Sequence, residues 1–233
     1  MKNIKKIIVA LIISLASCLY KNVKYKNGES NVKVNLGCGL QCLPGWINID
    51  GSLTALFGSK KNSWINKILY KLAGSSDYYS FAAYNKVIQE NGLNFYNLQK
   101  GVPLNDNSTD IVYCSHFLEH LNKVDGHHFL EECFRALKPG GLLRVVVPDL
   151  DFAMTMYQEG KVEEMQGLFF YTSDNWDFTA HKHNYNFAYL QSILAKIGFT
   201  KIVKLSYRQG ECPNIDYLDV YPEHSMYVEC RKI

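Results

Sequence analysis

The stretch KVNLGCGLQCLPGWINID, residues 33–50, constrains the fold more than any other part of this chain. A short apolar run meets Gly37 and Gly39, a pattern typical of a buried strand that turns beside a ligand at its carboxyl end. The dinucleotide pattern G-x-G-x-x-G would need a third glycine and the start of a helix. Cys42 occupies that third position, and Pro44 follows closely. The sequence therefore predicts a ligand-binding turn without the helix N-terminus that a pyrophosphate normally contacts.

Strand-like and helical patterns alternate along most of the 233 residues. Strand-like runs cover residues 32–36, 46–50, 93–97, 110–115, 142–147, 200–207 and 225–231. Helical patterns cover residues 124–137, which end at Pro139-Gly140-Gly141, and residues 186–197, which end at Gly198. Residues 51–92 form an extra segment with two further helical stretches.

This alternation predicts an α/β fold with a Rossmann-like, doubly wound, mostly parallel sheet of seven strands. The last two runs are joined by an irregular loop rather than a crossover helix, so we expect an antiparallel strand at one edge. The first helix is expected to be shortened, because the turn at Gly37 leads almost directly into the second strand. The segment of residues 51–92 becomes a helical insertion before strand three.

The N-terminus has a basic start and an apolar run from Ile7 to Tyr20, with small residues before Cys18. This pattern suits a bacterial lipoprotein signal peptide, and about 14 apolar residues are too few for a membrane span, which needs roughly 20. Alternatives are a helix packed on the domain, or a peripheral membrane contact through residues 4–20 with lysines facing anionic headgroups. We expect residues 1–26 to be a hydrophobic segment and linker that folding does not need, and residues 27–233 to be the functional domain.

Composition excludes some classes of protein. A net charge of +3 and a pI near 8.3, with no dense basic cluster, do not indicate a nucleic-acid-binding protein. Seven cysteines form no C-x-x-C pair, and several lie within apolar strand-like runs. We expect reduced, buried thiols in a reducing compartment, without a disulfide framework or a zinc site.

Asp50 ends the second strand-like run, where a carboxylate can accept two hydrogen bonds from ribose hydroxyls; the turn therefore suits a nucleoside. The motifs VNLGCG, WINID, DIVYCSHFLEHL, LKPGGLLRVVVPD and HKHNYNFAYLQSILAKIGF follow one another between residues 32 and 232. In this order they resemble the motifs of class I S-adenosylmethionine-dependent methyltransferases. More narrowly, they resemble a small bacterial branch often found among polysaccharide-biosynthesis enzymes. In that branch the turn runs almost directly into GWxNxD, which accounts for the shortened first helix.

The resemblance implies a cytoplasmic enzyme with S-adenosylmethionine as cofactor, and a methyl acceptor that is a small molecule or glycan precursor, methylated on a hydroxyl or similar group. No nucleic-acid partner is expected, because the net charge is mild. The positions that match the cofactor-binding motifs are Gly37, Cys38, Gly39, Asp50, Gly51, Asn97, Leu98 and Ser115. Asp50 would hold the ribose, and Asn97 would lie near the adenine amine. Asn97 and Asn35 stand where the family commonly has acidic residues.

A hydroxyl acceptor benefits from a base that takes its proton, and imidazole titrates near physiological pH. His116 follows strand four, and His181 and His183 lie in the loop before the last helix. These three are the candidate catalytic residues, with His183 and His116 preferred. Glu119 and His120 are expected on a short helix, where Glu119 could equally brace a loop.

A metal held by Asp149, His181 and His183 is conceivable in such an enzyme. Nothing in the spacing requires it, so no metal is predicted. Two other classes of function remain open. One is a non-catalytic binding or scaffold protein that retains the fold, exported as a lipoprotein lipidated at Cys18. The other is a nicotinamide-dependent reductase, which is disfavoured by Cys42, Pro44 and the lack of a second mononucleotide-binding half.

Overall fold

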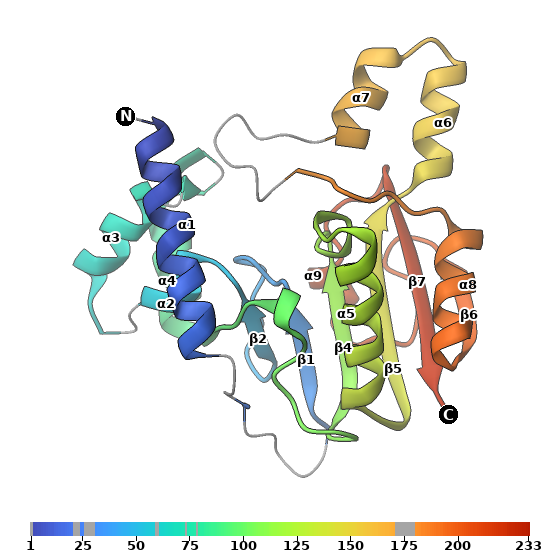
Figure 1. Ribbon diagram of the computed structural model, residues 1–233, viewed down its shortest axis with the longest axis horizontal. Coiled ribbons are helices and arrows are strands. Elements are labelled where there is room, and N and C mark those ends of the chain that lie inside the picture. The colour runs from blue at the N-terminus through green and yellow to red at the C-terminus, as the bar shows by residue number, and fades with distance from the viewer. Residues whose placement is uncertain are drawn as a thin grey trace.

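A seven-stranded mixed sheet organises the chain (Figure 1). The structure is a computed structural model that describes residues 2–20, 24–25, 31–58, 61–72, 74–77, 79–170 and 180–233. The strands are β1 (Lys33–Leu36), β2 (Ile47–Asp50), β3 (Leu93–Phe95), β4 (Thr109–Ser115), β5 (Leu137–Pro148), β6 (Phe199–Leu205) and β7 (Ser225–Lys232). Their order in the sheet is β3-β2-β1-β4-β5-β7-β6.

Strands β3, β2, β1, β4 and β5 pair in parallel, whereas β7 is antiparallel to both β5 and β6. The expected α/β class, the mostly parallel sheet and the antiparallel pairing of the last two strands are confirmed. In detail, β7 lies one position in from the edge and β6 forms the edge itself. Strand β7 can insert beside β5 because its connection from β6 reverses the chain without a crossover helix.

Nine α-helices and three 3₁₀ turns are found in the described residues. The helices are α1 (Lys2–Leu19), α2 (Leu53–Phe57), α3 (Ser63–Leu72), α4 (Phe81–Glu90), α5 (Lys123–Ala136), α6 (Leu150–Gln158), α7 (Val162–Phe170), α8 (Phe187–Ile197) and α9 (Ile215–Leu218). The 3₁₀ turns are η1 (Ser75–Asp77), η2 (Leu98–Lys100) and η3 (Leu118–His120). Residues 37–46, all described, contain turns and no helix, and α2, α3 and α4 precede β3. The shortened first helix and the helical insertion are therefore confirmed.

Local sequence explains where the two helices against the sheet begin and end. The side chains of Asn122 and Asn186 accept hydrogen bonds from backbone N–H groups in the first turns of α5 and α8. Helix α8 ends at Ile197 and is capped by Gly198, whose φ of 116° suits glycine. Helix α5 ends at Ala136, and β5 begins at once with Leu137. The Pro-Gly-Gly stretch thus lies within the span of β5, which starts earlier than residue 142.

The two faces of the sheet are covered differently. Helices α5 and α8 pack on one face and form the main core, in which Phe129, Leu130, Leu190 and Leu194 contact strand residues such as Val112 and Val145. On the other face, Trp46, Tyr113 and Val146 pack against Cys212, Ile215 and Leu218 from the connection between β6 and β7. This face therefore depends on a largely irregular segment for its cover.

A buried ion-pair network attaches that segment to the sheet. Arg144 in β5 is fully buried, and its Nη2 lies 2.5 Å from Oδ2 of Asp219 while its Nη1 lies 2.8 Å from Oε1 of Glu229. Arg144 also donates to the carbonyl of Gln209 at 3.0 Å. A Cβ atom at Gly210 would lie only 2.3 Å from Oε1 of Glu229, so the chain passes the network too closely for any side chain. The connection is thereby held to the middle of the sheet.

Helix α1 packs on the helical insertion through one face. Val9 is buried with Leu53, Tyr84 and Ile88, and Ala16 is buried in a second cluster with Ala55 and Phe95. Ile7, Leu11, Leu15 and Leu19, spaced four residues apart on the helix, are exposed. Within the part of the chain that the structure describes, no helix is both long and apolar enough to cross a membrane. The boundary expected at residue 26 lies outside the described residues.

We predict that Arg144→Ala lowers the free energy of unfolding by about 3–5 kcal/mol, because it leaves two buried carboxylates without their cation. Urea denaturation followed by circular dichroism measures the change. Lys86→Ala is the control: Lys86 forms an exposed pair with Glu90 at 4.0 Å, and its loss should cost under about 0.5 kcal/mol. A loss below about 1 kcal/mol for Arg144→Ala would contradict the structural role of the network.

Candidate functional site

The glycine turn and Asp50 lie together at the carboxyl ends of β1 and β2. The Asp50 carboxylate accepts the Gly39 N–H at 3.0 Å through Oδ2 and the Ser52 N–H at 2.8 Å through Oδ1. Gly37 and Gly39 have φ angles of 67° and 51°, which favour glycine. Asp50 thus faces the turn, as the ribose role requires. Each of its oxygens has a second lone pair with which to accept a ribose hydroxyl.

Gly37 is also where the turn touches the segment that follows β4. A Cβ atom there would lie 2.5 Å from Cγ of the Phe117 ring, so a larger residue would displace the ring. Part of the glycine requirement therefore comes from packing. The same contact joins the turn to the segment that carries His116 and Glu119.

Cys38 contributes to the turn mainly through its backbone. Its side chain is buried, and its Sγ lies 3.8 Å from Sγ of Cys42. Burial, together with the neighbouring Cys42 thiol, raises the pKa of Cys38 well above its usual value. The thiol therefore stays protonated and is a poor nucleophile.

The other proposed cofactor positions follow β2, β3 and β4. Asn97 Oδ1 accepts the Gln99 N–H at 3.1 Å and caps η2, while the Leu98 side chain is buried in the main core. A Cβ atom at Gly51 would lie 3.5 Å from the Tyr96 carbonyl oxygen, an ordinary contact. Ser115 is the half-buried last residue of β4. Because these strands are parallel, all four residues lie at the same edge of the sheet as Asp50.

A cavity of about 600 Å³ lies at the carboxyl ends of β4 and β5. Its lining comes from the segment after β4, the end of β5, helices α6 and α7, the segment before α8, and the segment before β7. Helices α6 and α7 lie beyond these strand ends (Figure 1). Four of its lining residues are histidines: His116, His120, His181 and His224. A cavity of this size can hold a ligand of the size of a sugar or a small aromatic molecule.

His116 links the cavity to a buried carboxylate. Its Nδ1 lies 3.2 Å from Oε1 of Glu119, and its Nε2 lies 2.9 Å from the Ser225 hydroxyl oxygen. The φ of His116 is 49°, a left-handed conformation that is uncommon for any residue except glycine. Such strained backbone is concentrated at functional sites. Here it turns the imidazole from the end of β4 towards Glu119.

Glu119 is fully buried, and neither of its carboxylate oxygens has a well-formed hydrogen bond from the described residues. Burial alone would raise the pKa of this carboxyl, but the contact with His116 and the electrostatic interactions with His116 and His120 outweigh it and hold the pKa below its usual value. Glu119 is therefore an anion at neutral pH. A buried anion of this kind requires compensation from its neighbours.

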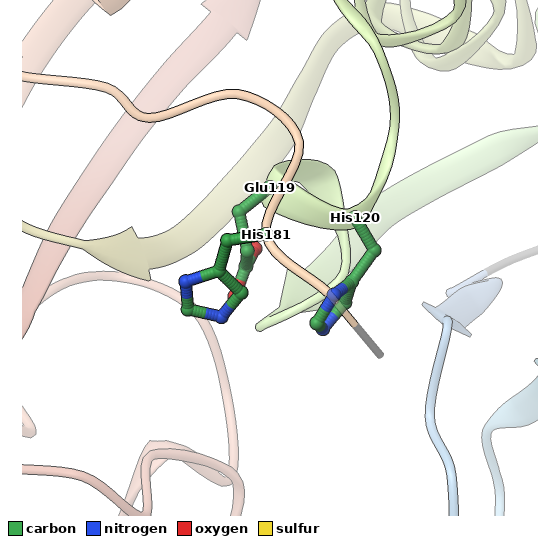
Figure 2. Close-up of side chains that lie close together, drawn as sticks. All are labelled: Glu119, His120 and His181. Carbon is green, nitrogen blue, oxygen red and sulfur yellow. The ribbon is translucent and has the colours of Figure 1, made fainter. Parts of the chain in front are cut away.

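His120 and His181 lie beside Glu119 (Figure 2). His120 Nδ1 lies 3.3 Å from the Ala180 carbonyl, and His181 Nδ1 lies 2.9 Å from the Leu168 carbonyl. A carbonyl only accepts, so Nδ1 carries the proton in each ring. His181 Nε2 is 3.9 Å from Oε1 of Glu119. Burial lowers the pKa of His181, which favours its neutral form.

The structure separates the three candidate histidines. His116 and His181 line the cavity, whereas His183 is absent from the lining that the described residues form. His183 Nε2 lies 3.2 Å from the Tyr189 hydroxyl, and its ring packs edge-on against Tyr185. Burial and the charge of Lys123 lower the pKa of His183.

The structure gives Asp149 and His183, two of the three residues considered from the sequence as metal ligands, other partners. Asp149 Oδ2 lies 2.8 Å from the ammonium nitrogen of Lys204, and His183 contacts Tyr189. Among the described residues, the group that could share an ion is Glu119, His120 and His181. From the sequence, Glu119 could be assigned only a role in bracing a loop. Ser225 and His224 could not be assigned to the site, because they are far from His116 along the chain.

Comparison with known proteins gives one family match. A model described as a methyltransferase domain matches residues 77–145, which run from η1 into β5 and include the segment from His116 to His120. This is less than half of the chain. No curated protein matches the sequence.

Several solved structures have a similar course of the chain. A SAM-dependent methyltransferase of Thermotoga maritima, a possible histamine N-methyltransferase, is 15% identical with a TM-score of 0.47, covering 95% of this chain and 87% of that chain. A possible exported protein of Bordetella parapertussis is 16% identical with a TM-score of 0.47, covering 92% and 64%. A SAM-dependent methyltransferase of Archaeoglobus fulgidus is 15% identical with a TM-score of 0.43, covering 96% and 94%. All three TM-scores are below 0.5, so these similarities carry no weight for function.

The methyltransferase-domain match supports the expectation that this chain is an S-adenosylmethionine-dependent methyltransferase, with S-adenosylmethionine as its cofactor. The turn and Asp50 fit that cofactor, because a carboxylate at the end of β2 faces a glycine turn at the end of β1. When bound, the cofactor supplies a methyl group activated as a sulfonium. The glycine turn and Asp50 are the residues that would hold it.

We predict that Asp50→Ala weakens S-adenosylmethionine binding at least about tenfold, since even one charge-assisted hydrogen bond contributes about 1.5–3 kcal/mol. Isothermal titration calorimetry measures the dissociation constant. Asp125→Ala removes a carboxylate at the start of α5, outside the turn, and should leave affinity unchanged. A change of less than twofold for Asp50→Ala, in a folded protein, would exclude the ribose role.

Proposed function

We propose that this protein transfers a methyl group to a hydroxyl of a small molecule or glycan precursor held in the cavity, with His116 as the general base. The observation that carries the proposal is that the His116 imidazole lines the cavity and at the same time contacts the buried Glu119 carboxylate, at 3.2 Å. The acceptor oxygen forms a bond to the methyl carbon as the bond from that carbon to sulfur breaks. The hydroxyl proton passes to Nε2 of His116.

Glu119 supports this role by its position on the other side of the ring. With Nδ1 of His116 3.2 Å from Oε1 of Glu119, the carboxylate favours a proton on Nδ1, and Nε2 is the nitrogen that can accept a proton from the acceptor. The carboxylate then stabilises the imidazolium that forms, because a buried anion next to a new cation interacts in a medium of low dielectric constant. The Ser225 hydroxyl now lies 2.9 Å from Nε2, which shows that this nitrogen can contact a hydroxyl group.

The class of acceptor follows from the cavity and from the sequence motifs. Histidine, tyrosine and serine side chains among its lining residues can donate and accept hydrogen bonds to several hydroxyl groups at once. The resemblance to the branch linked with polysaccharide biosynthesis favours a sugar hydroxyl. A cytoplasmic location accords with a methyl donor made inside cells, and the seven cysteines are all unpaired thiols.

We predict that His116→Ala lowers turnover by about 10²–10⁴-fold while the affinity for S-adenosylmethionine stays within twofold. Labelled cofactor is offered with nucleotide sugars, free sugars and phenols, and label transfer to the acceptor is measured. His183→Ala is the matched control, since it removes an imidazole outside the cavity lining.

Turnover of His116→Ala within threefold of the wild type would exclude the base role. If the wild-type protein binds the cofactor but methylates no acceptor of the panel, the result favours the alternative of a binding protein. A drop with His183→Ala comparable to that of His116→Ala would restore His183 as the base.

We also propose that residues 4–20, most of which belong to α1, contact a membrane surface peripherally. Helix α1 exposes a row of apolar side chains: Ile7, Leu11, Leu15 and Leu19. Trp64 is also exposed, and it belongs to α3, a helix that shares a hydrophobic cluster with α1. The first 76 residues carry eleven lysines against two acidic residues, whereas the whole chain has a net charge of only +3. Apolar side chains together with lysines suit the surface of an anionic bilayer.

We predict that the protein sediments with vesicles that contain anionic phospholipid, and does so less as salt concentration rises. Leu15→Glu should reduce this binding, because it places a charge in the apolar row. Val124→Glu, the same kind of change at an exposed valine on α5, should not. Equal sedimentation of the two variants with these vesicles would exclude α1 as the contact.

A further inference from the structure

We propose that Glu119, His120 and His181 form a binding site for a divalent transition-metal ion of the zinc type, at the edge of the cavity. One ligand atom from each residue lies within 4.8 Å of the others. In Figure 2 the three side chains gather at one place, two from η3 and one from the segment before α8. The site itself does not depend on the identity of the methyl acceptor.

The strongest evidence is the state of Glu119. Its carboxylate is 1% exposed, and both of its oxygens lack a well-formed hydrogen bond from the described residues. Buried polar groups in native proteins are nearly always hydrogen-bonded, so two unsatisfied oxygens on one buried carboxylate require a cause. Oε1 lies 3.2 Å from Nδ1 of His116 and 3.9 Å from Nε2 of His181, and neither contact is a well-formed hydrogen bond, so the carboxylate can take a further cationic partner. A metal ion would supply that partner.

The two histidines are held as metal-binding histidines usually are. In each ring Nδ1 faces a backbone carbonyl, that of Ala180 for His120 and that of Leu168 for His181. A metal-bound histidine commonly donates its other N–H to such a group, which selects the tautomer and orients the ring. Nε2 is then the unprotonated nitrogen that can bind an ion.

The backbone holds the parts of the site together. The N–H groups of Lys182 and His183 donate to the Glu119 carbonyl at 2.8 and 3.2 Å. The segment that carries His181 is thereby attached to the turn that carries Glu119 and His120.

The donor set selects the kind of ion. Two imidazoles and one carboxylate bind Zn²⁺ and similar ions well, whereas Mg²⁺ prefers oxygen ligands. Three protein ligands leave a coordination position open, and these ligands line the cavity. If the proposed function holds, an acceptor hydroxyl bound there would lose its proton to His116 more readily, because a metal ion lowers the pKa of a bound hydroxyl.

The test is calorimetric titration of metal-free full-length protein with Zn²⁺, with visible absorption of Co²⁺ as a second readout. We expect one Zn²⁺ per chain with a dissociation constant in the micromolar range or below. His120→Gln and His181→Gln should each weaken binding at least about tenfold and abolish the absorption bands of tetrahedral Co²⁺. Mg²⁺ should not compete.

His127→Gln is the matched control, because His127 forms an exposed pair with Glu131 on α5, with Nδ1 and Oε1 3.3 Å apart, and could bind zinc adventitiously. Binding that persists in His120→Gln and His181→Gln, or that is lost in His127→Gln, overturns the proposal. So does a wild-type dissociation constant above about 100 µM. His120 is only half-buried, so His120→Gln should fold. If His181→Gln fails to fold, the metal affinity of His120→Gln alone tests the proposed site. Metal binding is measured without cofactor or acceptor, so its outcome is separate from that of the methyl-transfer assay.

Discussion

The ion pairs of Arg144 with Asp219 and Glu229 are the constraint on which the functional end of this protein depends. They attach the irregular connection between β6 and β7 to the centre of the sheet. That connection leads directly to Tyr221 and Ser225, which line the cavity and contact His116. Buried ion pairs often add little net stability, because removing charges from water is costly. Here the network's evident role is to select one path for a segment that has little regular structure.

The glycine turn at Gly37–Gly39 and the cavity lie at the same edge of the sheet. Parallel strands bring the ends of β1, β2, β4 and β5 to the same side, so residues far apart in sequence become neighbours. Phe117 packs against Gly37 and so joins the turn to the segment that carries His116. This proximity is what a transfer reaction requires, because donor and acceptor must be held in line.

Glu119 has a central place in the proposed chemistry. One buried carboxylate lies within 3.2 Å of His116 and within 3.9 Å of His181, so a base role for the first and a metal role for the second involve the same anion. An ionised carboxylate without well-formed hydrogen bonds is costly to bury, and such cost is typically retained at functional sites.

Helix α1 lies far from this chemistry. It packs on the helical insertion beside β3, the edge strand opposite β6 (Figure 1).

The sequence by itself determined the α/β class, the strands, the shortened first helix and the turn with Asp50. These follow from local patterns: apolar periodicity, asparagine caps, and glycines at positive φ. The tertiary structure alone decided which histidines meet, because His116, Glu119, His181 and Ser225 come from separate segments that only the sheet brings together. It also revealed the partners of Arg144, since a single arginine in an apolar strand indicates burial without naming its counterions. Local periodicity reports which face of an element is buried, whereas a site depends on contacts between elements, and those are set by packing.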